Sequence, residues 1–168
     1  LETELAKRGK SLQLSDEELD DLVDIEFGDR RVFPLLALLY PSVDVRQEFD
    51  VDHVFPWARF DKKKLRKAGI PEDRVDDFKE QANRLANLHL LDRPRNQGKG
   101  DRLPTEWLQS AFSRPADRQA YCERNDFGAL PEAMEGFPQF YEDRRTSLRA
   151  RVARLLGMPS GRESSRSR

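Results

Sequence analysis

Residues 50–56 read Asp-Val-Asp-His-Val-Phe-Pro. Apolar side chains alternate here with Asp50 and Asp52, so residues 48–54 are predicted to form a short strand with one buried face. Pro56 ends this strand because proline has no N–H for a ladder hydrogen bond. Next to Asp52 comes a histidine, and a carboxylate beside an imidazole is a pairing that acid–base chemistry uses.

A second stretch, residues 86–99, reads Ala-Asn-Leu-His-Leu-Leu-Asp-Arg-Pro-Arg-Asn-Gln-Gly-Lys. Residues 88–92 are predicted to form another short strand, in which His89 lies between two leucines and is expected to be packed or at a strand edge. Residues 93–99 are predicted to form a short helix or turn, which Gly98 limits. The remaining sequence has helical apolar spacing, so the expected fold class is α+β, with a mostly helical body and one inserted pair of strands.

The helical body is predicted on both sides of the two strands. Ser15 and Glu18 have the spacing of a capping box, ahead of a helix that should run to about Phe27 and place that side chain on the face of Leu19, Leu22 and Val23. Trp57 and Trp107 occupy helical positions and are expected in the core rather than as platforms for stacking bases. The other helices are expected over residues 32–40, 57–68, 71–85, 104–112, 115–124 and 137–156.

The chain has 168 residues, which is enough to bury a core, and one domain is expected over residues 1–158. The strand-bearing part covers about residues 48–104 and contains a helical insertion at residues 57–85. Residues 159–168 lack apolar side chains and are expected to be disordered. The expected helical flanks are residues 12–40 and 104–157.

Three features of the composition bound the class of protein. Cys122 is the single cysteine, which excludes a disulfide within the chain and fits a reducing cytoplasm. No apolar run is long enough to span a bilayer and no signal-peptide pattern is present, so no membrane partner is expected. The chain starts with Leu1 rather than Met, so we expect a fragment of a longer protein.

Charge is unevenly distributed, although the net charge is only -1. Residues 15–29 carry eight acids and no base, residues 62–67 carry five bases, and residues 144–168 carry eight arginines against the single acid Glu163. A polyanion responds to local patches more than to the sum, so the basic segments allow a nucleic-acid partner. Solvated helix faces are the simpler explanation of the same runs.

The polar residues of the two stretches suit hydrolysis of a phosphodiester, which needs charge neutralisation at the phosphate and a base for the attacking water. Asp52 offers a carboxylate oxygen and Asn96 an amide oxygen, and such ligands favour Mg²⁺ or Mn²⁺. His53 titrates near neutral pH and suits a general base. Lys99 suits a phosphate contact. Asn87 is expected to bond the backbone of the segment that carries His53.

The order of these motifs resembles the HNH, or ββα-metal, nuclease domain over about residues 48–104. The resemblance rests on the Asp-Val-Asp-His-Val-x-Pro strand, the Asn-Leu-x-Leu-Leu strand and the Asn-x-Gly-Lys helix, followed by Asp101 as in the HNH domain of RNA-guided CRISPR nucleases. The motifs are closer still to the C-terminal nuclease of GmrSD-type modification-dependent restriction enzymes, and phosphorothioate-sensing phage-defence proteins are built similarly.

This resemblance implies two short antiparallel strands and a helix around a metal ion. It implies that His53 is the general base, that Asp52 and Asn96 are the metal ligands, and that Asn87 is the structural asparagine. It further implies that an NTP-hydrolysing or sensor domain precedes the nuclease in a longer chain. The sequence departs from many HNH enzymes in having Asn96 instead of a histidine and in its long insertion at residues 57–85.

Together these features predict a metal-dependent DNA endonuclease domain that nicks DNA, as the effector of a larger anti-phage restriction protein. Two alternatives stay open: a non-catalytic DNA-binding module with a decayed site, and a helical module that docks an upstream NTPase. The motifs do not distinguish DNA from RNA. The residues expected to contact backbone phosphates are Lys62, Lys63, Lys64, Lys67, Arg84, Arg93, Arg95, Lys99 and Arg102.

Overall fold

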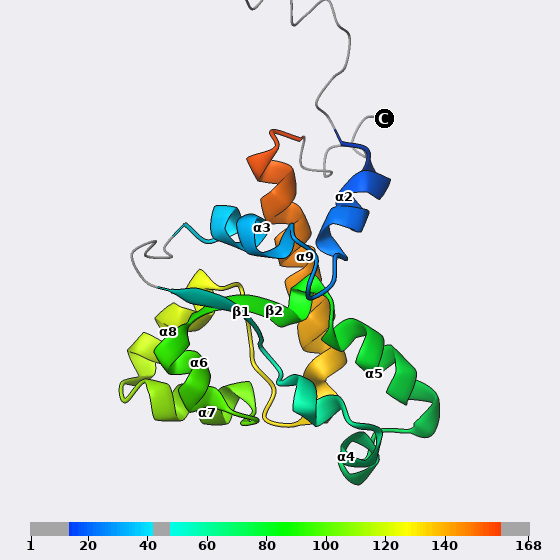
Figure 1. Ribbon diagram of the computed structural model, residues 1–168, viewed down its shortest axis with the longest axis vertical. Coiled ribbons are helices and arrows are strands. Elements are labelled where there is room, and N and C mark those ends of the chain that lie inside the picture. Colours follow the sequence, from blue (N-terminus) through cyan, green and yellow to red (C-terminus); the bar gives the residue numbers. More distant parts are fainter. Residues whose placement is uncertain (1–13, 42–47, 159–168) are drawn as a thin grey trace, which may run out of the picture.

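The computed structural model describes residues 14–41 and 48–158 (Figure 1). Over these residues it has eight α-helices and one sheet of two antiparallel strands, which confirms the α+β class with a mostly helical body. The predicted tail at residues 159–168 lies outside the described residues. The helices are α2 (Asp16–Val23), α3 (Val32–Leu39), α4 (Lys62–Lys67), α5 (Val75–Ala82), α6 (Arg93–Lys99), α7 (Pro104–Ala111), α8 (Pro115–Arg124) and α9 (Phe137–Leu155).

The two strands are β1 (Phe49–His53) and β2 (Leu88–Asp92), and both lie where the sequence predicts them. Their register pairs Asp52 with His89 across the ladder. Helix α6 follows β2 without a loop, because the Asp92 side chain accepts a hydrogen bond from the Arg95 N–H at 3.1 Å and caps the helix. The chain order strand, strand, helix thus places α6 against both strands.

Helix α9 is the element around which the body is built. It contacts α2, α3, α5 and the 3₁₀ turn that precedes β2. Figure 1 shows α2 and α3 near one end of α9, α4 and α5 on the right of the view, and α6, α7 and α8 together on the left. Phe137, Phe140 and Leu148 of α9 are buried in the apolar core, which also takes in Phe55. No helix in the described ranges has the length and apolarity that crossing a membrane requires.

Helix α2 begins as predicted and ends early. The capping box of Ser15 and Glu18 is present. Helix α2 stops at Val23, so the predicted end at about Phe27 is wrong, and Phe27 is 46% exposed. The reason is tertiary: the Phe27 N–H donates to the Asn83 carbonyl at 2.8 Å, which draws the backbone out of the helical path.

The insertion also differs from the expected pair of helices. Residues 57–60 form a 3₁₀ turn, and Asp61 then accepts hydrogen bonds from two backbone amides and starts α4. Trp57 is 49% exposed, so its predicted core position is wrong, whereas Trp107 is 2% exposed as expected. Helix α5 buries Val75, Phe78 and Ala82, as the apolar spacing predicts.

Candidate functional site

Asp52 is the centre of a polar cluster between the sheet and α6. Its Oδ2 atom lies 2.5 Å from the Lys99 ammonium and 3.2 Å from His89 Nε2. The ammonium also donates to the His53 carbonyl, and the Lys99 side chain is only 2% exposed. Strand register supplies Asp52 and His89, and α6 supplies Lys99 from its last turn. Residues 47 positions apart are thereby joined by a buried ion pair.

The carboxylate of Asp52 is held in its ionised form. Burial alone would raise the pKa of Asp52, but the hydrogen bond from His89 and the positive charge of Lys99 outweigh it and hold the pKa well below its usual range. Burial lowers the pKa of Lys99, and the charge of Asp52 opposes this effect. A buried charge that lost its partner would be strongly destabilising, so each member of the pair fixes the other.

His89 is buried, as predicted, and it has a partner that the sequence did not reveal. An ionised carboxylate only accepts hydrogen bonds, so His89 donates through Nε2–H to Asp52. Its Nδ1 atom then accepts from the Tyr121 hydroxyl at 3.4 Å. Burial lowers the pKa of His89 to about 4, so the ring is neutral near pH 7. The series of hydrogen bonds from Tyr121 to His89 and from His89 to Asp52 fixes the orientation of the carboxylate.

His53 is the last residue of β1, and its neighbours differ from those of Asp52. Its Nε2 atom lies 3.3 Å from the amide oxygen of Asn83, at the end of α5. The ring centroids of Phe27 and Trp57 lie 4.8 and 5.9 Å from that of His53. The two side chains of the Asp-His pair therefore keep the alternation of a strand and meet different surroundings.

The environment of His53 favours a neutral ring. Burial lowers its pKa below the ordinary value, and this effect exceeds the opposing influence of the Asn83 hydrogen bond and of the Asp52 charge. Because the Asn83 oxygen accepts a hydrogen bond from Nε2–H, Nδ1 is the unprotonated nitrogen of the ring. The imidazole can therefore take up a proton at Nδ1.

Asn87 makes the backbone bonds that the sequence predicts. Its Oδ1 atom accepts from the Phe55 N–H at 2.9 Å, and its Nδ2 donates to the carbonyls of Phe55 at 3.0 Å and Ala82 at 2.8 Å. The side chain is fully buried. It therefore ties the segment after His53 to the end of α5, and its contribution to a reaction stays a prediction.

Asn96, the second predicted metal ligand, is half-buried on α6. It precedes Lys99 by three residues, which places both on one side of the helix. Within residues 14–41 and 48–158 no cluster of three or more His, Cys, Asp or Glu side chains is arranged to hold a metal ion. Asp52 Oδ1 has no hydrogen bond among the described residues, and a metal ion shared by Asp52 and Asn96 stays a prediction.

Many of the basic residues predicted to contact DNA are paired within the chain. Lys62 lies 2.5 Å from Glu72, and Lys64 lies 3.8 Å from Asp101. Three of the arginines form ion pairs: Arg84 with Glu80 and Asp24, Arg93 with Glu48 and Asp50, and Arg95 with Asp92. Arg102 instead donates hydrogen bonds to the backbone carbonyls of Gly98 and Lys99. Lys63 and Lys67 are exposed, and neither forms an ion pair within the described part of the chain.

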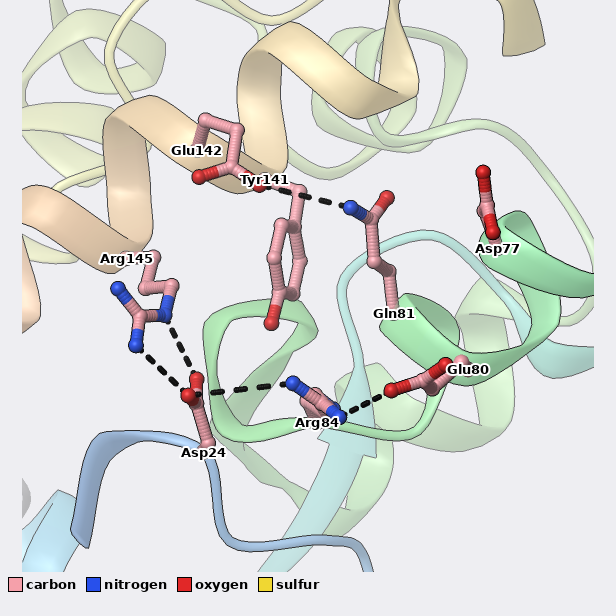
Figure 2. A pocket seen from close by; sticks show the side chains of 8 residues that line it. All are labelled: Asp24, Asp77, Glu80, Gln81, Arg84, Tyr141, Glu142 and Arg145. Carbon is pink, nitrogen blue, oxygen red and sulfur yellow. Dashed lines mark hydrogen bonds and ion pairs between the residues drawn. The ribbon is translucent and has the colours of Figure 1, made fainter. Parts of the chain in front are cut away.

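A shallow polar pocket of about 280 Å³ lies over the junction of α5 with the 3₁₀ turn before β2 (Figure 2). Asp24 sits between two guanidinium groups there, 2.6 Å from Arg145 and 3.9 Å from Arg84. Figure 2 shows the Tyr141 ring directed toward this group. Neither Asp52 nor His53 lines the pocket, and its ion pairs join the end of α2 to α9 and to the end of α5.

Sequence reasoning found the motif residues and missed the side chains that surround them. Asn83 and Phe27 lie in segments without a motif, and backbone bonds between residues 25–27 and 83–85 bring both to His53. A single sequence carries no signal for such a long-range contact. Neither protein-family models nor curated proteins match this chain.

Proposed function

We propose that this chain is an HNH-type, metal-dependent endonuclease domain that hydrolyses phosphodiester bonds in DNA. The observation that supports this most is the cluster in which Asp52 and Lys99 form a buried pair beside the His53 backbone. Two predicted motifs, far apart in sequence, contribute to it. The adjacent residues Asp52 and His53 supply an ionised carboxylate and a neutral imidazole, which a hydrolytic site needs near pH 7, from side chains with different neighbours.

His53 is the general base in this proposal. Its lowered pKa leaves the ring neutral at pH 7, and Nδ1 has the lone pair that accepts a proton from water. Asn83 fixes the tautomer, and Asn87 fixes the backbone that follows His53. The ring is therefore oriented before a substrate arrives, which removes an entropic cost from the reaction.

In this proposal the metal ion is a hard divalent cation held by oxygen ligands. Asp52 and Asn96 are the residues that would hold it, through one carboxylate oxygen and one amide oxygen, and water would complete the shell as Mg²⁺ usually requires. When bound, Mg²⁺ or Mn²⁺ supplies positive charge to the phosphate and to the departing oxygen. Lys99 keeps Asp52 ionised and in place, and its burial makes this role more favourable than the predicted phosphate contact.

Backbone phosphates would be bound by basic residues near the cluster. Lys63 and Lys67 are exposed on α4, and Arg93 and Arg95 lie on α6 in ion pairs that are half-open to solvent. Exposed ion pairs are worth less than about 1 kcal/mol, so a phosphate can displace the acid. Contacts of this kind bind DNA without reading its sequence.

The resemblance to GmrSD-type enzymes extends the proposal to the whole protein. The domain would be the effector of a larger anti-phage restriction protein, in which an NTPase or sensor domain controls cleavage. This part rests on the motifs alone.

The test is the nicking of supercoiled plasmid with Mg²⁺ or Mn²⁺, with EDTA as the blank. We expect the wild-type chain to produce open circles and His53→Ala to lose at least about 100-fold in rate, because a general base typically contributes that much. Thermal melting of both proteins checks that the fold is kept. Equal nicking by the two proteins would contradict the assignment.

One observation favours an alternative. Asp52 Oδ2 is already bonded to Lys99 and His89, as in a buried pair kept only for structure. In that case the chain is a decayed, non-catalytic DNA-binding module. It would then retard DNA in a gel, and no metal would elicit nicking.

A further inference from the structure

Two aromatic side chains beside His53 are exposed to solvent. Phe27 and Trp57 flank the imidazole and are 46% and 49% exposed. Phe55 and Trp107, by contrast, are at most 2% exposed. Solvent contact at such large rings forgoes the favourable free energy of burial, and a patch of this kind often marks a binding site.

Both rings are held in place by backbone bonds. The turn after α2 closes through the Asp29 N–H to the Glu26 carbonyl at 3.0 Å, and the Phe27 N–H bonds to Asn83 at 2.8 Å. Gly28 has a φ of 93°, which the turn needs and which other residues rarely adopt. The rings are therefore presented by fixed backbone.

Trp57 is presented in the same way. It follows Pro56 and begins a 3₁₀ turn, which the Arg59 N–H closes on the Pro56 carbonyl at 2.8 Å. A side chain on such a rigid turn loses little entropy when a flat ligand covers it. Phe27, His53 and Trp57 thus form one aromatic row that the fold prepares in advance.

From this row we infer that Phe27 and Trp57 each stack on an unpaired nucleobase near the phosphate under attack, so that single-stranded or locally unpaired nucleic acid is the preferred substrate. The inference rests on the proposed function, because the ring between them is the proposed base. Any nucleobase has a flat π-face that stacks on an aromatic ring. Duplex bases offer only their edges in the grooves, so a paired base cannot reach the row.

The test measures binding in EDTA, so that no cleavage is needed. The labelled ligands are an oligothymidylate of about 15 nucleotides, an abasic strand of equal length, and a duplex. The wild-type chain should bind the oligothymidylate most tightly. Phe27→Ala and Trp57→Ala should each weaken that binding by roughly 5- to 150-fold, the usual range for one stacked base, and should leave binding of the abasic strand unchanged.

Phe33→Ala is the matched control, because Phe33 is 44% exposed and forms no ring pair with His53 within the described residues. Trp57→Phe keeps a ring and should restore the preference for bases. Equal loss on the oligothymidylate and the abasic strand would overturn the inference, as would wild-type affinity in both alanine variants. An aromatic patch that serves a protein partner instead would give this second result.

The outcome is separable from that of the proposed function. A chain that nicks plasmid but binds both single strands equally would contradict only the stacking. A chain that prefers bases but never nicks would contradict only the nuclease. Trp57 adds a direct readout, because it is one of two tryptophans and the other, Trp107, is buried. Stacking should quench its fluorescence with the oligothymidylate and not with the abasic strand.

Discussion

The Asn83 amide sets both the tautomer and part of the basicity of His53. Its oxygen accepts a hydrogen bond from Nε2–H of His53, so Nδ1 is the nitrogen that can accept a proton. Burial, the largest influence, lowers the pKa of the ring. A general base works only in its neutral form, so a lowered pKa extends activity toward acid. The acid limb of the nicking rate should therefore lie below about pH 6.5, the ordinary value for histidine.

Asn83→Asp tests this account. The substitution puts a carboxylate beside the imidazole, which favours the charged ring and raises its pKa. Because the neutral ring is then populated only at higher pH, the acid limb of the pH–rate profile should move to higher pH. The measurement is the nicking rate from about pH 5 to pH 8. Asn83→Ala supplies the control without added charge, and an unmoved acid limb in Asn83→Asp would contradict the role of His53.

The elements divide into those that local sequence determines and those that it does not. Strand β2 and helix α6 occupy their predicted residues, because Asp92 caps the helix and ends the strand at one position. Local sequence is enough to predict the bounds of these two elements. Asp52, His53 and Asn87 were identified for the same reason, since each belongs to a short contiguous motif.

Long-range contacts decide the parts that were predicted wrongly. Apolar spacing continues α2 to Phe27, but the isolated bridge between Glu26 and Arg84 and the bond to Asn83 pull the chain away after Val23. The same bonds bring Asn83 and Phe27 to His53. Because the two residues of each contact are distant in sequence, neither helix propensity nor apolar periodicity predicts these contacts.

Arg84 gives a prediction at the level of elements. It joins the end of α5 to α2 through Asp24 and is paired with Glu80, so we expect a structural role. Arg84→Ala should lower the melting temperature by a few degrees, in line with a loss of about 1 kcal/mol in the free energy of unfolding, and leave the salt dependence of DNA binding unchanged.

Lys67→Ala is the counterpart, because this exposed lysine has no ion pair within the described residues. It should leave the melting temperature unchanged and reduce the slope of log affinity against log salt by about one. The reverse pattern in the two variants would restore Arg84 as a DNA contact.

At the scale of the whole molecule, two long charge runs neutralise each other. Asp20 and Asp24 of the acidic N-terminal segment pair with Arg145 and Arg149 of α9. The segregation along the sequence therefore produces an interface between helices and leaves less basic surface for DNA than the count of arginines suggests. The net charge of residues 144–168 taken alone does not reveal this neutralisation, because the acidic partners lie far away in the sequence.

Buried histidine makes the stability of the fold depend on pH. The pKa of His89 is about 4 when folded, below its ordinary value of 6.5. Between these values the unfolded chain binds more protons, so the free energy of unfolding decreases as the pH falls. This group alone should make the protein roughly 2 kcal/mol less stable at pH 5 than at pH 7.

Urea unfolding at the two pH values measures the effect. His89→Gln keeps a hydrogen-bond donor for Asp52. In this variant the free energy of unfolding should differ between pH 7 and pH 5 by roughly 2 kcal/mol less than in the wild-type chain, and the remaining difference includes the contribution of His53. An identical pH dependence in both proteins would mean that His89 is already charged in the fold.

The buried guanidinium of Arg144 has a consequence for protein engineering. It donates to the carbonyls of Ala86 and Leu88, on either side of Asn87, and to that of Asn125. As a cassette for transplantation the β1–β2–α6 unit is incomplete, because its second strand is anchored by a side chain 56 residues beyond Leu88. A transplant of residues 48–104 alone would leave those carbonyls without their donor, so a recipient scaffold has to carry α9 along with the cassette.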